Sequence, residues 1–225
     1  MKRTSLAAIM LFMSLTLIGC GHHHDDHDRP PDQIVKQILS DSAFDGDIVR
    51  DPLTGLFTVT QGMNPSVQSV FAGIDPDTDA EYRAFLDFPF RGAGGVPGNA
   101  FIDSAILDIV INSISPQPLI GTIPIRIELV SFQPPTLVVT DFDRTLQPAL
   151  AFTTIMPPIS SADIGYHVSV DVTSLMIEAQ RLGFADFQLR ILEDLGFVNP
   201  GRIEINDTTG VNREALAPLL IVTYR

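Results

Sequence analysis

The sequence predicts an all-β domain, an antiparallel β-sandwich with one short crossover helix. From Asp45 onward, short runs rich in Val, Ile, Phe and Thr are separated by Pro, Gly, Asn and Asp at intervals of about 8–15 residues, which is typical of such sandwiches. Clear helical periodicity occurs in one later segment, 171–183. About 190 residues follow the N-terminal region, which suits one sizeable domain, placed at 34–225.

The expected strands follow the apolar runs. In two of them alternate residues are apolar and therefore share a face. These residues are Ile123, Ile125, Ile127 and Leu129 in one strand, and Val168 and Val170 in the other. The full set of expected strands is 47–50, 56–61, 67–72, 82–89, 102–112, 122–132, 136–141, 165–170, 186–192, 202–206 and 217–224.

The segment 171–183 has the pattern of an amphipathic helix. Asp171 or Thr173 can cap its start, and Gly183 suits the left-handed residue that ends many helices. Its apolar face consists of Val172, Leu175, Met176 and Ala179. The segment therefore predicts the one crossover helix of the sandwich.

A second, shorter helix is expected at 32–40, just ahead of the strand-rich region. Asp32 can cap its start. The apolar residues that would share one side of it are Ile34, Val35, Ile38 and Leu39.

The first 19 residues have the pattern of a secretory signal peptide. Lys2 and Arg3 precede an uncharged run at 6–18, which at about 13 residues is too short to span a bilayer. The run ends in Leu17-Ile18-Gly19-Cys20, which resembles the lipobox of bacterial lipoproteins. The resemblance implies cleavage before Cys20 and acylation of its thiol, with palmitate among the usual chains. The alternative is an ordinary signal peptide with a chance cysteine.

Cysteine usage favours the lipoprotein interpretation. Cys20 is the sole cysteine of the chain, so it cannot form an internal disulfide, and a lone thiol would be a liability in an oxidising compartment. Each buried methylene adds about 0.8 kcal/mol of membrane affinity, so several acyl chains would hold the protein at a membrane. We expect the outer membrane if the host is Gram-negative, because Gly21 is not the aspartate that marks inner-membrane retention.

Residues 20–33 are expected to form a lipidated, flexible stalk. They are polar and contain Pro30 and Pro31, so they have no apolar face to bury. Four histidines lie among aspartates in this stretch and could bind Zn²⁺, Ni²⁺ or Cu²⁺ through imidazole nitrogen: His22, His23, His24 and His27. A disordered stalk must lose entropy on binding, so the affinity should be weak, and the alternative is a plain spacer.

Charge excludes nucleic acid as a partner. The chain has 14 Lys and Arg against 27 Asp and Glu, a net charge of −13. Loss of Lys2 and Arg3 with the signal peptide leaves 12 against 27, a net charge of −15. Such a chain repels polyanions, and its basic residues are scattered along the sequence.

The order of several motifs resembles the DNRLRE or disaggregatase-related modules, which are jelly-roll domains grouped with carbohydrate-binding modules. The matching pieces are Asp45-Gly46, Tyr82-Arg83-Ala84-Phe85-Leu86-Asp87-Phe88, Ile102-Asp103-Ser104-Ala105-Ile106-Leu107, Asp171-Val172-Thr173, Phe187-Gln188-Leu189-Arg190 and Pro218-Leu219-Leu220-Ile221-Val222-Thr223-Tyr224. The resemblance covers about residues 43–225 and implies a jelly roll that binds glycans. The chain has no tryptophan, so a sugar platform would rest on phenylalanines or on Tyr82, Tyr166 and Tyr224.

An acidic loop is a candidate calcium site. Four carboxylates alternate along 75–81, just ahead of an expected strand, and hard oxygen ligands at this density suit Ca²⁺. They are Asp75, Asp77, Asp79 and Glu81. The loop is not an EF-hand, because Ala80 and Leu86 stand where glycine and glutamate are needed. The alternative is a solvated acidic turn, whereas the resemblance to calcium-containing jelly rolls implies a structural ion.

The motifs give little support for an enzyme. His167 is the sole histidine outside the stalk, and the chain contains neither a Gly-x-Ser-x-Gly elbow nor a His-Glu-x-x-His pair. The glycine-rich segment 92–98 lacks the ending of a phosphate loop and reads as an inter-strand loop. We therefore expect a lipid-anchored, non-catalytic module that binds a glycan or an envelope protein, with a structural or assembly lipoprotein as the alternative.

Overall fold

Strands dominate the computed structural model, which describes residues 32–62, 68–92, 94–116, 121–132, 136–194 and 200–225. Twelve of the described strands form one hydrogen-bonded sheet, and β7 and β10 form a separate pair. The strands are β1 Ile34–Leu39, β2 Gly46–Arg50, β3 Phe57–Gln61, β4 Ser69–Ile74, β5 Glu81–Pro89, β6 Ile102–Pro116, β7 Thr122–Ile123, β8 Ile125–Val130, β9 Ala151–Thr154, β10 Ile159–Ser160, β11 His167–Asp171, β12 Asp186–Glu193, β13 Gly201–Asn206 and β14 Leu219–Tyr224. The helical elements are η2 Val139–Phe142, η3 Ser161–Asp163, α1 Thr173–Leu182 and α2 Arg213–Leu216.

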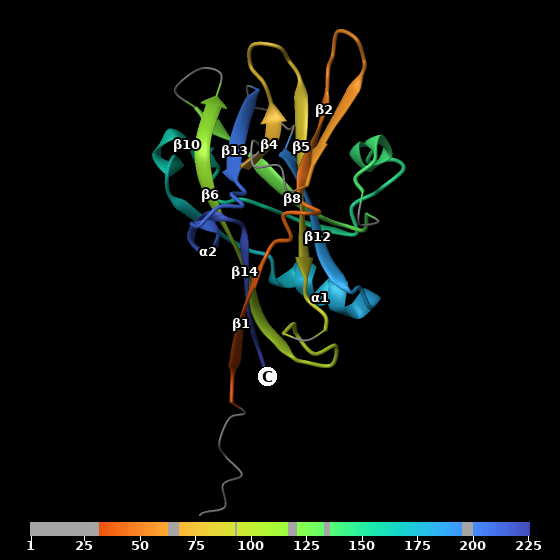
Figure 1. Ribbon diagram of the computed structural model, residues 1–225, viewed down its shortest axis with the longest axis vertical. Coiled ribbons are helices and arrows are strands. Elements are labelled where there is room, and N and C mark those ends of the chain that lie inside the picture. Colours follow the sequence, from red (N-terminus) through yellow and green to blue (C-terminus); the bar gives the residue numbers. More distant parts are fainter. Residues whose placement is uncertain (1–31, 63–67, 93, 117–120, 133–135, 195–199) are drawn as a thin grey trace, which may run out of the picture. The chain divides into compact units, whose positions relative to one another are not determined.

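The large sheet curls on itself and encloses the main core, which confirms the all-β, antiparallel sandwich. Its main path runs β1-β14-β6-β13-β4-β5-β12-β8-β9, and every pairing along it is antiparallel. The long strand β6 pairs with β14 and β11 through one part and with β13 through the other, so it joins the two halves of the sandwich. The first and last strands, β1 and β14, lie side by side (Figure 1).

The strand pattern read from the sequence is confirmed in the core. Ile123, Ile125, Ile127 and Leu129 are all fully buried in the main cluster, as their alternation predicts. The expected strand 122–132 is interrupted, however, and becomes β7 and β8. Pro124 lies between them and has no backbone N–H to donate to a ladder.

Helix α1 forms where the sequence predicts it. Val172, Leu175, Met176 and Ala179 are fully buried against the core, and Gly183 ends the helix in the left-handed conformation at φ 78°. The Asp171 carboxylate accepts a hydrogen bond from the Thr173 amide, and the Thr173 hydroxyl accepts one from Ala105 of β6. The helix start is thereby tied to the sheet.

Two expected elements are wrong. The segment expected to be a helix at 32–40 contains β1, because pairing with β14 satisfies its backbone and buries Ile38 in the core. The expected strand 136–141 overlaps the 3-10 helix η2, Val139–Phe142. There the Asp141 carboxylate accepts the Val138 amide at 2.8 Å, a local bond that turns the chain away from an extended path.

The segment that contains η2 covers the outer face of the sheet. A second apolar cluster forms beneath it, made by Ile48, Phe85, Val130, Phe132, Leu137 and Phe142. The rings of Phe85 and Phe132 meet edge to face, with centroids 5.7 Å apart. This segment buries the second face of β5, β8 and β12, so these strands carry apolar or hydrogen-bonded side chains on both faces. The candidate site lies at the edge of the covering segment.

Candidate functional site

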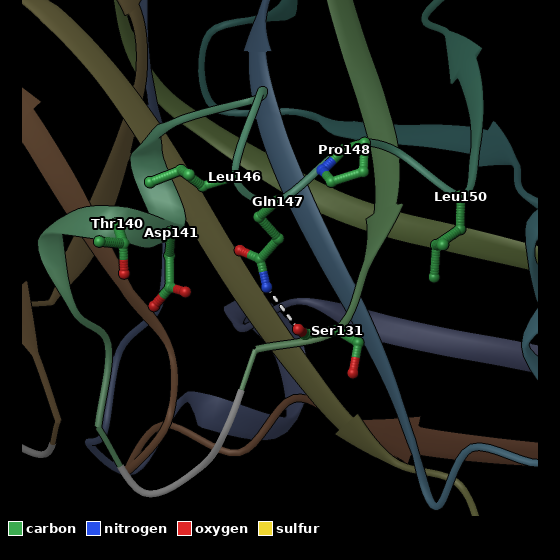
Figure 2. A pocket seen from close by; sticks show the side chains of 7 residues that line it. All are labelled: Ser131, Thr140, Asp141, Leu146, Gln147, Pro148 and Leu150. Atoms are coloured by element: carbon green, nitrogen blue, oxygen red, sulfur yellow. Dashed lines mark hydrogen bonds between the residues drawn. The ribbon is translucent and has the colours of Figure 1, made fainter.

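A pocket of about 320 Å³ lies between the end of β8 and the segment that follows η2. Its lining consists of Ser131, Thr140, Asp141, Leu146, Gln147, Pro148 and Leu150 (Figure 2). Gln147 points across the pocket and its amide donates a hydrogen bond to the Ser131 carbonyl oxygen. Its carbonyl oxygen Oε1 is buried and has no hydrogen-bond partner among the described residues. The pocket thus combines apolar side chains with polar lining groups.

The wall of the pocket is fixed by Arg190 of β12, whose side chain is fully buried. Its Nη1 donates to the Asp141 carbonyl at 2.8 Å and its Nη2 to the Gln147 carbonyl at 2.9 Å. The guanidinium also bonds to Glu128 Oε2 through Nε at 2.9 Å and Nη2 at 2.7 Å. Burial lowers the pKa of Arg190, and the bonds to Glu128 oppose that shift. One side chain therefore ties two lining residues to the sheet.

Three arginines share the carboxylate of Glu128, which is fully buried. Arg126 and Arg144 contact Oε1 at 2.9 Å and 2.7 Å, and Arg190 contacts Oε2. The three guanidinium groups thus gather around one carboxylate, although the whole chain is strongly acidic. The outer side of the network is accessible, because Arg144 is partly exposed.

An exposed aromatic ring lies beside this network. Phe152 of β9 is 56% exposed and pairs across the ladder with Glu128. The Arg126 guanidinium lies 3.6 Å from the centroid of its ring, in cation–π geometry. Together with Leu146 and Leu150, Phe152 extends the apolar rim outside the pocket. Of the three tyrosines, Tyr224 is buried, Tyr82 is half-buried beside Arg202, and Tyr166 is 67% exposed.

The acidic loop expected to bind calcium has partners within the protein. Asp75 Oδ1 accepts the amides of Asp77 and Thr78, and its Oδ2 pairs with Arg202 at 2.7 Å. Glu81 pairs with Arg83. Asp79 adopts a left-handed φ of 57°. Within the ranges that the structure covers, no three His, Cys, Asp or Glu side chains converge to hold a metal ion. The loop is thus not brought together as a four-carboxylate cage, and calcium binding there stays a prediction.

Several predicted residues lie outside the described part of the chain. These are the lipidation site Cys20 and the stalk histidines His22, His23, His24 and His27. His167, within the described part, bonds through Nδ1 to Asp108 Oδ2 at 2.8 Å. None of the helices that the structure describes could span a bilayer; α1 has 10 residues, and about 20 are needed.

Sequence reasoning missed the pocket and its arginine network. A signal was present, because Glu128 and Arg190 are charged residues inside apolar strand patterns, and the period of two places each on the face opposite its core neighbours. No comparable signal marks Thr140 in η2, or Leu146 and Gln147 in the irregular segment that follows it.

Comparisons with known proteins do not place the chain in a family. No family model matches it, and no curated protein matches its sequence. The resemblance to the DNRLRE modules therefore rests on the motifs of the chain itself.

Proposed function

We propose that this protein is a lipid-anchored, non-catalytic binding module of the bacterial cell envelope, and that its pocket takes part of a glycan. The observation that carries the proposal is the pocket itself, with apolar side chains from Leu146, Pro148 and Leu150 and polar lining groups. A sugar ring presents hydroxyl groups around its edge and C–H groups on its faces, which matches a lining of polar and apolar groups. At about 320 Å³ the volume suits one sugar unit.

The rigid wall supports binding without chemistry. Arg190 holds the carbonyls of Asp141 and Gln147, so the ligand would meet a preformed surface and lose little free energy to ordering the protein. His167 gives no support for hydrolysis. Ser169 donates to Asp108 rather than to His167, whereas an activated serine bonds to the histidine itself.

A protein partner in the envelope is the second candidate. It is favoured by β1, an edge strand that pairs with β14 on one side among the described strands. Ile34 and Val35 of this strand are at least half exposed. An exposed, apolar edge can accept a strand from another protein, and β1 directly follows the expected stalk in the sequence.

A glycan array tests the first candidate with a pair of matched variants. Leu146→Ala removes an exposed side chain from the rim, and Leu53→Ala removes one of the same kind, 92% exposed, in the turn after β2. We expect the first variant to weaken glycan binding by about tenfold and the second to leave it unchanged. Equal effects, or no bound glycan together with co-purification of an envelope protein, would favour the second candidate.

The anchor is tested by Cys20→Ser. The acyl chains supply the strong membrane attachment in this proposal, so the variant should stay uncleaved or be released from membranes. The measurement is fractionation after a high-salt wash, with the mature N-terminus determined by mass spectrometry. A variant that still fractionates with membranes and has a normal mature N-terminus would contradict lipidation.

A further inference from the structure

The start of β1, the segment 94–101 ahead of β6 and the C-terminus meet at one end of the domain (Figure 1). The Gln33 side-chain amide donates to Asp103 Oδ2 at 3.1 Å, and Arg225 Nε contacts Asp103 Oδ1 at 3.3 Å. Backbone hydrogen bonds in both directions join Phe101 to Arg225. We refer to these residues and the segment 94–101 as the stalk end, because the expected stalk joins the domain at Gln33.

The stalk end presents an exposed aromatic ring with a cation beside it. Phe101 is 61% exposed, and the Arg225 guanidinium lies 4.7 Å from the centroid of its ring. Ile34 of β1 is 50% exposed and pairs across the ladder with Tyr224, the residue before Arg225. Aromatic and apolar side chains flanked by basic ones suit the boundary between the headgroups and the hydrocarbon of a bilayer.

Unpaired positive charge also gathers at this end. Most of the described lysines and arginines form ion pairs with carboxylates. The described ones that form none are Lys36, Arg50 and Arg91. A Cβ built on Gly94 would lie 3.6 Å from Lys36 Nζ, and one built on Gly98 would lie 3.7 Å from the Arg91 guanidinium. Two of the three unpaired cations therefore lie against the segment 94–101.

The segment that leads to the exposed ring is held in place. The side-chain amide of Gln180 in α1 donates to the Ala100 carbonyl at 2.9 Å and to the Pro97 carbonyl at 3.2 Å. Val96 is 2% exposed, and its amide donates to the Phe90 carbonyl at 2.6 Å. A surface built on such a segment is preformed, so a contact made through it loses little free energy to ordering the protein.

We propose that the stalk end is a second membrane contact, which binds an anionic bilayer surface through Lys36, Arg91 and Arg225 and places the Phe101 ring among the headgroups. The remainder of the chain is strongly acidic and is repelled by such a surface. This separation of charge orients the domain. The β2–β3 hairpin, which lies at the opposite end, then points away from the membrane (Figure 1).

The inference rests on the lipid anchor of the proposed function. Residues 21–32 connect Cys20 to Gln33 and extend to at most about 40 Å, so an anchored chain keeps the stalk end near the bilayer. A short tether raises the effective concentration of the surface to the millimolar range. The attraction of a few basic side chains to anionic lipid is weak and falls off within a Debye length, so the contact depends on this tether.

A tryptophan reporter tests the contact. The chain has no tryptophan, so Phe101→Trp supplies a single fluorescent group at the stalk end. The full lipidated chain is placed in vesicles of phosphatidylcholine with about one quarter phosphatidylglycerol and a nitroxide-labelled headgroup lipid. We expect a blue shift and quenching, which fade at about 1 M salt, where the Debye length is about 3 Å. The matched control, Leu53→Trp in the turn after β2, is at a 92% exposed position and should stay unquenched.

A pair of charge variants tests the unpaired cations. In the Phe101→Trp chain, Arg91→Glu should reduce the quenching several-fold, whereas Arg50→Glu reverses an exposed cation of the β2–β3 hairpin and should leave the quenching unchanged. Equal quenching of the two tryptophan reporters, or none in either while the chain floats with the vesicles, would overturn this inference alone. A chain that does not float with the vesicles would contradict the lipid anchor and the inference with it.

Discussion

Glu193 of β12 is a buried carboxylate whose ionisation opposes folding. Its Oε2 accepts the Gly201 amide at 3.3 Å, and its Oε1 has no hydrogen-bond partner within the described ranges. Burial raises its pKa to about 7. The folded protein therefore binds a proton at pH values where the unfolded chain has lost it. The contribution of this proton to the free energy of unfolding is complete below about pH 4.5 and is lost as the pH rises through about 7.

We expect Glu193→Gln to flatten the decline of unfolding free energy between pH 4.5 and pH 7. The wild-type loss from this one group has a ceiling of about 3.5 kcal/mol, because its pKa rises from 4.5 to about 7 and each pKa unit corresponds to about 1.4 kcal/mol. The measurement is urea unfolding at several pH values. Glu178→Gln, on the solvent-facing side of α1, is the control and should keep the wild-type slope. Parallel pH profiles for wild type and Glu193→Gln would show that the carboxyl titrates normally.

Arg190 shows how a buried charge can be required by its neighbours. Replacing it with Met fills a similar volume but leaves the carbonyls of Asp141 and Gln147 and one oxygen of Glu128 without their donors. We expect a loss of about 3–5 kcal/mol of unfolding free energy. Arg144→Ala removes a half-exposed partner of the same carboxylate and should cost at most about 1 kcal/mol. Equal losses of unfolding free energy for the two variants in urea unfolding would mean that the buried bonds of Arg190 stabilise the fold no more than the ion pair of Arg144 does.

At the scale of elements, β4 and β13 approach too closely for side chains at one point. Gly73 has φ 113°, and a Cβ built on it would lie 2.1 Å from the Gly201 carbonyl oxygen. We expect Gly73→Ala to destabilise the protein by about 2–5 kcal/mol through strain and overlap. The comparison is Gly55→Ala, at φ 69° with open space around it, which should cost about 1–2 kcal/mol. If chemical denaturation gives both variants the same cost, steric overlap at β13 is not the cause.

The elements also show what the sequence can and cannot predict. Alternating strands and α1 were predictable, because their apolar faces have a local period. The segment 32–40 was not, since Ile34, Val35, Ile38 and Leu39 fit a helix face and a paired strand equally well, and the choice depends on β14, far along the chain. The pocket was still harder to predict from the sequence. Its lining comes from a segment without periodicity, held by Arg190 from β12.

At the scale of the whole molecule, the contacts separate the chain into Met1–Asp32 and Gln33–Arg225. The second unit contains the described strands, both apolar clusters and the arginine network. The residues of both apolar clusters all lie within Gln33–Arg225. The second unit should therefore be able to fold without the N-terminal region.

A fragment that begins at Asp32 should fold alone, with a β-dominated circular dichroism spectrum and the melting temperature of the full chain. A second fragment that begins at Ser40 lacks β1 and serves as the comparison. Loss of β1 removes the strand that pairs with β14 and exposes the side of the core that Ile38 covers. This shorter fragment should therefore melt at a clearly lower temperature. A mainly helical spectrum of the first fragment would contradict the sandwich. Equal melting temperatures for the two fragments would show that β1 is an appendage rather than part of the sheet.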